Sequence, residues 1–347
     1  MRNLFQSKYL PIIISLVLFI IPFFWLKPGE MDLGGDGNRL YYYDPLSYLF
    51  NDGLYMVDHV IEGVRTIEPH YYHLPYVVLL LGIKTIVSSS YFLIAFINGL
   101  KLSLSFLSIY LIIRTILQNS YKEKKIFELS LPSILGGLFY ITTPIMIGNY
   151  DKALISQNQV FLNPLLFYLL LVYFLQQKFR YLALAIAVTI INTPNFSWVS
   201  APPFFSFFPL AILYLILYVV SILKKRIIFS HLFIAILLFL GLHSFHLIPE
   251  IYNLLSPGSY INERVFDKNN ILSQLNYFYG VLPIAKLSLN ILIYDPFKAL
   301  AWSSVIPAAF VLVGFVLNKF RNKIYPLTGI FFLITLYLLT ANITASG

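Results

Sequence analysis

Long apolar runs alternate with short polar segments along almost the whole chain. Most runs extend over roughly 17–25 residues, the length that an α-helix needs to cross a bilayer. The pattern predicts an all-α polytopic membrane protein with about nine transmembrane helices. We expect these helices at Tyr9–Leu26, Tyr91–Leu117, Leu129–Ile147, Phe161–Gln176, Tyr181–Asn195, Phe204–Leu223, Ile227–Ile248, Leu300–Leu317 and Tyr325–Ala341.

The polar segments indicate the orientation of the chain. Lys and Arg are enriched in cytoplasmic loops, and the dense basic clusters, such as Lys122, Lys124 and Lys125, all fall on one side of this arrangement. The N-terminus is therefore predicted to be cytoplasmic. One apolar run, Leu74–Val87, is only about 14 residues long, which is short for a span. We expect it to lie along the outer interface, because crossing would place the basic loop that follows it outside.

Composition narrows the class of protein further. Of the 347 residues, 59% are hydrophobic and 11% are charged, whereas a soluble domain carries about a quarter charged residues. The net charge of +9 comes from the basic clusters between apolar runs, so it indicates loop orientation and no nucleic-acid partner. The chain has no cysteine, which excludes disulfides, thiol catalysis and cysteine-ligated metals. No cleavage site follows the first apolar run, so we interpret it as an uncleaved helix.

Residues that could carry chemistry are concentrated in the first of two long outer segments, 27–73 and 249–298. Segment 27–73 holds eight of the 15 acidic residues and three of the six histidines. Ionisable groups gathered in one loop between hydrophobic segments are typical of an active site. The sequence therefore predicts an extracytoplasmic site on an integral protein of the cell membrane.

The order of these elements resembles a known superfamily. A short cytoplasmic start, one helix and a large acidic outer loop with surface helices are similar to the plan of the GT-C glycosyltransferases. Within them, Gly35–Leu49, which runs Gly-Asp-Gly-Asn-Arg-Leu-Tyr-Tyr-Tyr-Asp-Pro-Leu-Ser-Tyr-Leu, resembles the segment after the first helix of the large α-arabinofuranosyltransferases of cell-wall arabinan synthesis. The apolar run after His73–Pro75, the segment Gly137–Pro144 and the segment His246–Pro249 are similar to that family as well.

The resemblance implies one GT-C-like transmembrane domain over residues 1–347. It also implies an enzyme that transfers a hexose or a pentose from a polyprenyl-phosphate donor to an envelope glycan, lipid or protein at the outer face. Membrane lipid is then a further partner. The family's enzymes are longer, and this chain ends without a basic tail, so we expect it to be part of a longer protein.

Glycosyl transfer needs a base that takes the proton of the acceptor hydroxyl. The resemblance places the family's catalytic-type aspartate at Asp36, between two glycines; the alternative is an Asp that only shapes a turn. Asp32 is the nearest rival and Asp44 the next. The pair Asp44–Pro45 also suits a helix start, with Asp as the cap and Pro in the first turn.

The donor phosphate needs cations or a metal ion. Arg39 and Arg65 are the candidates in the first segment and Arg264 in the second; the alternative for each is a solvated or ion-paired side chain. His70 and His73 have the spacing of metal ligands on one helical face, and the resemblance leaves Mg²⁺ or Mn²⁺ open. The neighbouring prolines and tyrosines favour interfacial histidines instead, so we assign no metal site and no certain cofactor.

Two residues outside the first segment are expected at the same outer level. Trp198 could stack on a sugar ring, although an interfacial anchor is the commoner role of Trp. His246 lies near the end of the span Ile227–Ile248 and, with His243, repeats the spacing of three. The resemblance implies that His246 faces the site, and core packing is the alternative.

Two other classes of function stay open on the sequence. One is a transporter or flippase of lipid-linked sugars; few charges in the middle of the spans and no inverted repeat count against it. The other is a non-catalytic membrane subunit of an envelope assembly. A scaffold has no need of so many carboxylates beside its first helix, so we favour the enzyme.

Overall fold

The computed structural model describes residues 9–25, 40–54, 60–61, 64–65, 73–120, 126–143, 146, 158–191, 212–222, 224, 226, 228–255, 327 and 329–330. Contacts group the chain into two compact units. The first consists of Met1–Ala201 and Ile228–Pro249, and the second of Pro202–Ile227 and Glu250–Gly347. The first unit contains every residue of the candidate site that the structure describes.

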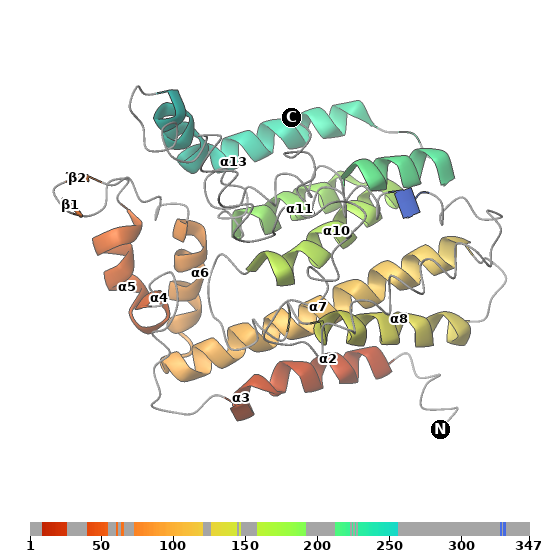
Figure 1. Cartoon of the computed structure of the whole chain (residues 1–347), viewed down its shortest axis with the longest axis horizontal. Coiled ribbons are helices and arrows are strands. Elements are labelled where there is room, and N and C mark those ends of the chain that lie inside the picture. The colour runs from red at the N-terminus through yellow and green to blue at the C-terminus, as the bar shows by residue number, and fades with distance from the viewer. Residues whose placement is uncertain are drawn as a thin grey trace, which may run out of the picture. The chain divides into compact units, whose positions relative to one another are not determined.

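The described part is mostly helical (Figure 1). Its elements are α2 (Leu10–Ile20), α3 (Pro22–Trp25), α4 (Leu40–Tyr43), α5 (Pro45–Tyr48), the π-helix η1 (Leu49–Gly53), α6 (Leu74–Lys84), α7 (Ser90–Ser120), α8 (Ile126–Ile141), α10 (Asn158–Gln176), α11 (Phe179–Ile191), the π-helix η5 (Tyr218–Ile222) and α13 (Phe229–Leu255). A two-residue hairpin, β1 (Val60–Ile61) with β2 (Val64–Arg65), pairs antiparallel. The expectation of an all-α chain therefore needs this small correction.

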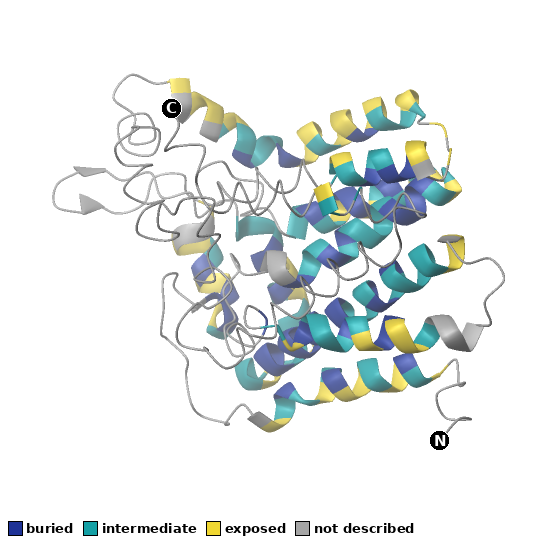
Figure 2. Ribbon diagram, turned by 45° about the vertical axis from the view of Figure 1, so that its right-hand side comes forward, coloured by how far each residue is buried: buried dark blue, intermediate teal, exposed yellow. Residues whose placement is uncertain are grey.

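Helix α7 is the centre of the first unit. It packs against α2, α8 and α10, and Figure 2 shows its buried residues in dark blue. Glycines allow the close approaches: a Cβ on Gly99 would lie 2.2 Å from the backbone oxygen of Phe19 in α2, and one on Gly137 of α8 would lie 2.8 Å from the ring of Phe106. Gly99 and Gly137 therefore allow α7 to pack closely against α2 and α8, although neither glycine stands out within its apolar run.

Two hydrogen bonds give the direction of α2 relative to α7. The hydroxyl of Tyr91, at the start of α7, donates to the carbonyl of Phe23 (2.7 Å), and Ser15 reaches the carbonyl of Ser103 (3.5 Å). Rising numbers in α7 therefore pair with falling numbers in α2, so the two helices are antiparallel. We call the region where α3 ends and α7 begins the tyrosine end of the first unit.

Helix α6 confirms a short helix in the predicted interfacial run, with Lys84 as its last residue. Its 11 residues extend about 16 Å, half the thickness of a hydrocarbon core. The chain then turns and begins α7 at Ser90. This length supports a helix that does not cross, and its place at the interface stays a prediction.

Two helices in the described part are long and apolar enough to cross a membrane, Ser90–Asn119 and Phe229–Pro249. The other predicted spans that the structure describes form shorter apolar helices, including Leu10–Phe24, Ser130–Ile141, Phe161–Gln176 and Phe179–Ile191. The last two of the nine predicted spans lie outside the described residues except for positions 327, 329 and 330. Nine spans stay a prediction.

Helix α13 continues past the expected start of the second outer segment, through Pro249 to Leu255. Where this segment leaves the membrane stays a prediction. Proline removes one backbone donor, and membrane helices tolerate this because neighbouring groups satisfy the freed carbonyl. Residues 256–298 of that segment lie outside the described part of the chain.

Candidate functional site

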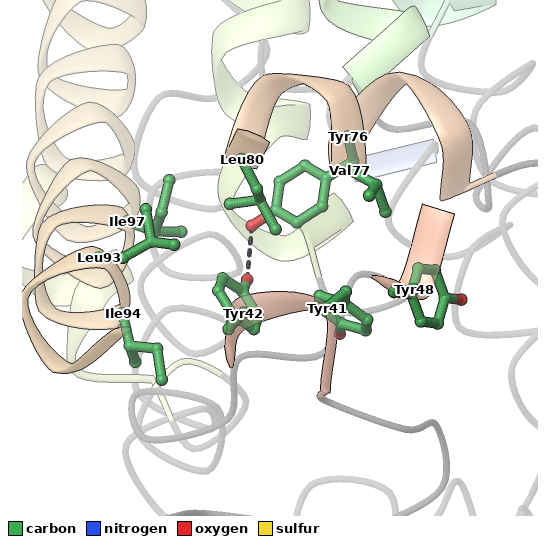
Figure 3. Packing of buried hydrophobic residues seen from close by; sticks show 9 residues of the cluster. All are labelled: Tyr41, Tyr42, Tyr48, Tyr76, Val77, Leu80, Leu93, Ile94 and Ile97. Atoms are coloured by element: carbon green, nitrogen blue, oxygen red, sulfur yellow. Dashed lines mark hydrogen bonds between the residues drawn. The ribbon is translucent and has the colours of Figure 1, made fainter. Parts of the chain in front are cut away.

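Short helices of the first outer segment form an aromatic cluster at the tyrosine end (Figure 3). We call this group of buried side chains the tyrosine cluster: Tyr41, Tyr42 and Tyr48 from α4 and α5, Tyr76, Val77 and Leu80 from α6, and Leu93, Ile94 and Ile97 from α7. The hydroxyls of Tyr42 and Tyr76 lie 2.6 Å apart in a hydrogen bond. A tyrosine can bury its aromatic ring without leaving its hydroxyl unsatisfied when that hydroxyl is hydrogen-bonded. The cluster therefore joins α4, α5 and α6 to the first turns of α7.

Asp44 caps α5, as the Asp-Pro pair predicts. Its Oδ1 accepts from the backbone N–H of Ser47 (3.0 Å) and its Oδ2 accepts from the Ser47 hydroxyl (2.7 Å). These bonds, followed by the nearby charge of Lys84, lower the pKa of the Asp44 carboxyl. A carboxylate with a lowered pKa is a weaker base, so the geometry favours the capping role over the catalytic one.

Lys84 ties α6 to the end of α4. Its ammonium donates to the carbonyls of Tyr43 and Tyr42, the latter at 3.4 Å, and to the Ser90 hydroxyl at 3.3 Å. Partial burial lowers the pKa of Lys84, and the charge of Asp44 acts in the opposite direction. The sequence shows only that Lys84 ends an apolar run. Its carbonyl partners lie about 40 residues earlier in the chain, so no local pattern predicts this contact.

His73 lies at the edge of the tyrosine cluster. Its Nδ1 is 3.1 Å from the hydroxyl of Tyr48, and its ring centroid is 6.3 Å from that of Tyr41. This arrangement fits an interfacial histidine. His70 lies outside the described residues, and those that are described contain no group of three potential metal ligands.

A second polar arrangement joins α13 to α11. Nε2 of His243 lies 2.8 Å from the Thr189 hydroxyl, and Nδ1 of His243 lies 2.7 Å from Nε2 of His246. Both histidines are 0% exposed and Thr189 is 4% exposed. We call these three side chains the histidine seam.

The hydrogen bonds of the histidine seam have a direction. The Thr189 hydroxyl donates its single proton to the carbonyl of Ile186 (2.6 Å), so its oxygen accepts from His243. Nδ1 of a neutral His243 then accepts from Nε2–H of His246. This places the acceptor nitrogen of His246 at Nδ1. The chain of bonds orients His246 through Thr189, a residue that the sequence argument did not single out.

Helix α11 places the histidine seam near the tyrosine cluster. Ile191, its last residue, packs against the cluster, and α11 contacts α6. Thr189 precedes Ile191 by two residues, which is about 3 Å along a helix axis. The tyrosine end therefore combines three predicted site residues, Asp44, His73 and His246.

The side chains of the other predicted site residues lie outside the described part of the structure. Arg65 ends β2, where its backbone pairs with Val60. The rest lie outside the described residues: Asp32, Asp36, Arg39, His70, Trp198 and Arg264. Comparisons with protein-family models, with characterised proteins and with solved structures find nothing that matches this chain.

Proposed function

We propose that this chain is a polytopic membrane glycosyltransferase of GT-C type. It moves a sugar from a polyprenyl-phosphate donor to an envelope glycan, lipid or protein at the outer face of the cell membrane. The observation that carries the proposal is the tyrosine cluster, which holds the first outer segment against α6 and α7. Asp36 precedes α4 by four residues, so the chain keeps it within about 14 Å of that anchored helix.

The proposed reaction is a single displacement. The Asp36 carboxylate takes the proton of the acceptor hydroxyl while that oxygen forms a bond to the anomeric carbon. The bond from this carbon to the phosphate oxygen breaks, and the polyprenyl phosphate leaves with the electron pair. Cations stabilise the leaving phosphate; Arg39, Arg65 and Arg264 are the proposed ones, with Mg²⁺ or Mn²⁺ as the alternative.

The reaction is tested with purified protein in lipid nanodiscs and labelled polyprenyl-phosphate sugars, one pentose and one hexose. Asp36→Asn keeps the size of the side chain and removes the base, so turnover should fall by about a hundredfold or more. Asp44→Asn is the matched control, because Asn also caps helices well and turnover should largely persist.

Three outcomes would change the proposal. A normal Asp36→Asn enzyme with an inactive Asp32→Asn or Asp44→Asn variant moves the base to that residue. Full turnover in all three variants removes the base from this segment. Movement of the labelled lipid across the bilayer without sugar release points to a flippase.

The proposed orientation has its own test, because the chain has no cysteine. Single cysteines at positions 52 and 124 are exposed to a membrane-impermeant thiol reagent in intact cells. Position 52 should react, since it follows the first helix on the outer side, and position 124 should not, since it lies in a basic cytoplasmic loop. The opposite pattern would reverse the topology.

A further inference from the structure

We propose that Asn98 and Lys101 of α7 form a buried binding site for a phosphate group carried by a lipid. The inference deepens the proposed function by naming residues that would hold the donor's phosphate, and it rests on that function only for the identity of the lipid. Nothing in the sequence pattern singles out Asn98, which lies in the first third of the predicted span Tyr91–Leu117.

The site belongs to a polar stripe on α7. Asn98, Lys101, Ser105 and Ser108 are 2%, 6%, 0% and 2% exposed, and their spacing of three, four and three places them on one helix face. The Ser105 hydroxyl donates to the carbonyl of Lys101 (2.7 Å) and reaches that of Phe161 in α10 (3.4 Å). The stripe therefore faces α10 inside the first unit. An ionisable side chain on such a buried face of a membrane helix is typical of a ligand or ion pathway.

The Lys101 ammonium lies where α10 begins. Its nitrogen is 5.2 Å from the ring centroid of Phe161, and α10 starts three residues earlier at Asn158. Helical side chains lean toward the N-terminus of their helix, so the ammonium lies beside the first turn of α10. That turn carries the positive end of the helix dipole. Two positive groups facing each other favour an anion between them.

Asn98 supplies an independent observation. It is 2% exposed, yet neither its amide nitrogen nor its amide oxygen has a hydrogen-bond partner. Native proteins rarely leave a buried amide unsatisfied. Asn98 precedes Lys101 by three residues, so the two side chains are neighbours on the helix surface. One phosphate can accept from the amide N–H and from the ammonium together.

The site follows the tyrosine cluster along α7. Ile97, the residue before Asn98, belongs to that cluster. Leu102, the residue after Lys101, packs with Ile141, the last residue of α8, and with Phe161. The polar pair is therefore at the level where α8 ends and α10 begins. The proposed polyprenyl-phosphate donor is the reason to expect a lipid and not a free phosphate at this site, and the experiment below distinguishes the two.

Arg114 is the matched control on the same helix. Its guanidinium donates to the Tyr110 hydroxyl at 2.9 Å and lies 5.8 Å from the Tyr110 ring centroid. Lys101 and Arg114 therefore each lie near an aromatic ring, that of Phe161 in α10 and that of Tyr110 in α7. Arg114, unlike Lys101, is only half-buried and lies near the opposite end of α7.

The experiment measures equilibrium binding of radiolabelled polyprenyl phosphate to the full chain in nanodiscs, without acceptor or sugar. Lys101→Met should weaken binding about ten- to hundredfold, because it removes a charged hydrogen bond. Asn98→Leu should weaken it about fivefold, Lys101→Arg should retain most of it, and Arg114→Met should leave it unchanged. Unlabelled polyprenol, which lacks the phosphate, should not compete.

Several other results would overturn either the site or its lipid ligand. Equal binding by wild type and Lys101→Met, equal weakening by Arg114→Met, or competition by polyprenol would overturn the site. Competition by inorganic phosphate at the same concentration as the lipid would overturn the lipid source. If Lys101→Met does not fold in a thermal-unfolding assay, Asn98→Leu carries the test. Binding that depends on Lys101 in a protein without transferase activity would support the site and reject the proposed enzyme.

Discussion

Helices α7 and α13 have similar composition and different surroundings. They have 31 and 27 residues, and each contains a window long and apolar enough to cross a membrane. In α7 67% of that window is buried inside the protein, and in α13 only 17% is. Many apolar side chains of α13 are exposed, for example Phe233, Leu237 and Leu240. Apolar length therefore indicates a span but does not distinguish a central helix from a peripheral one.

Both helices also carry buried polar residues. On α13, His243 and His246 are joined to Thr189 by a chain of hydrogen bonds that links this helix to α11. On α7, Asn98 is buried and neither of its amide atoms has a hydrogen-bond partner. Hydrogen bonds between helices can hold a peripheral helix in place, and a buried amide without a partner is rare in native proteins.

The largest effect is expected from adding a methyl group to α7. In Gly99→Ala the new Cβ meets the Phe19 backbone oxygen at 2.2 Å, so α2 must move away. Overpacking of this kind costs about 1–3 kcal/mol, and a backbone contact belongs at the upper end. Unfolding in mixed micelles, followed by circular dichroism, measures the loss.

Gly241→Ala on α13 is the paired control. A Cβ there has nothing within 4 Å, and Ala has the higher helix propensity, so stability should stay equal or rise by about 1 kcal/mol. Equal losses in the two variants would contradict the assignment of α7 as the central helix.

The next effect concerns the hydrogen bond between Tyr42 and Tyr76 above α7. Either Phe substitution removes one hydroxyl and leaves the other buried, which costs about 1–3 kcal/mol. The double variant should lose less than the sum of the two single variants, because both partners are then gone. Tyr252→Phe on α13, where the side chain is 68% exposed, should change stability by less than about 0.5 kcal/mol. Strict additivity at Tyr42 and Tyr76 would rule out their coupling.

A smaller effect is expected in the histidine seam. Thr189→Val removes the hydroxyl that accepts from His243 and should cost about 1–2 kcal/mol. It should also shift the tautomer of His243 away from the Nε2–H form, which nitrogen-15 NMR of labelled histidine detects. Thr189→Ser keeps the hydroxyl and should preserve the spectrum. An unchanged tautomer in Thr189→Val would show that the seam does not orient the histidines.

The smallest effect is the pH dependence of the Asp44 cap. The pKa of Asp44 in the folded protein lies below its ordinary value of 3.8, so its stabilisation is complete above pH 3.8 and is lost as the pH falls through the lowered pKa. Asp44→Asn does not titrate and should lack this acid step in thermal unfolding. An equal acid step in both proteins would mean that other carboxyls cause it.

Local patterns predicted a good part of the fold. The ranges expected for the first span and for Tyr91–Leu117 match α2 with α3 and α7 closely, since apolar runs and basic flanks are local features. Asp44–Pro45 predicted the cap of α5 for the same reason. The end of α13 was missed, because a proline next to an apolar run is a weak stop signal in a membrane helix.

Much of the candidate site depends on contacts that no local pattern contains. Lys84 meets the carbonyls of α4 after the chain has returned from the hairpin. His243 meets Thr189 across 54 positions of sequence. Hydrogen bonds between distant residues depend on how helices are rotated and aligned, and apolar periodicity is too degenerate in these helices to specify rotation.

The sequence by itself determined the mostly helical character of the chain, the short helix before α7, the cap at Asp44 and the concentration of acids in one segment. These follow from composition, length and neighbouring residues, which act over one or two helical turns. Only the tertiary structure decided that α7 is central, that hydrogen bonds join the histidine seam, and that Asn98 and Lys101 share a buried face of α7. Burial depends on which face of each helix meets its neighbours, and close packing sets that choice through contacts such as Gly99 against Phe19.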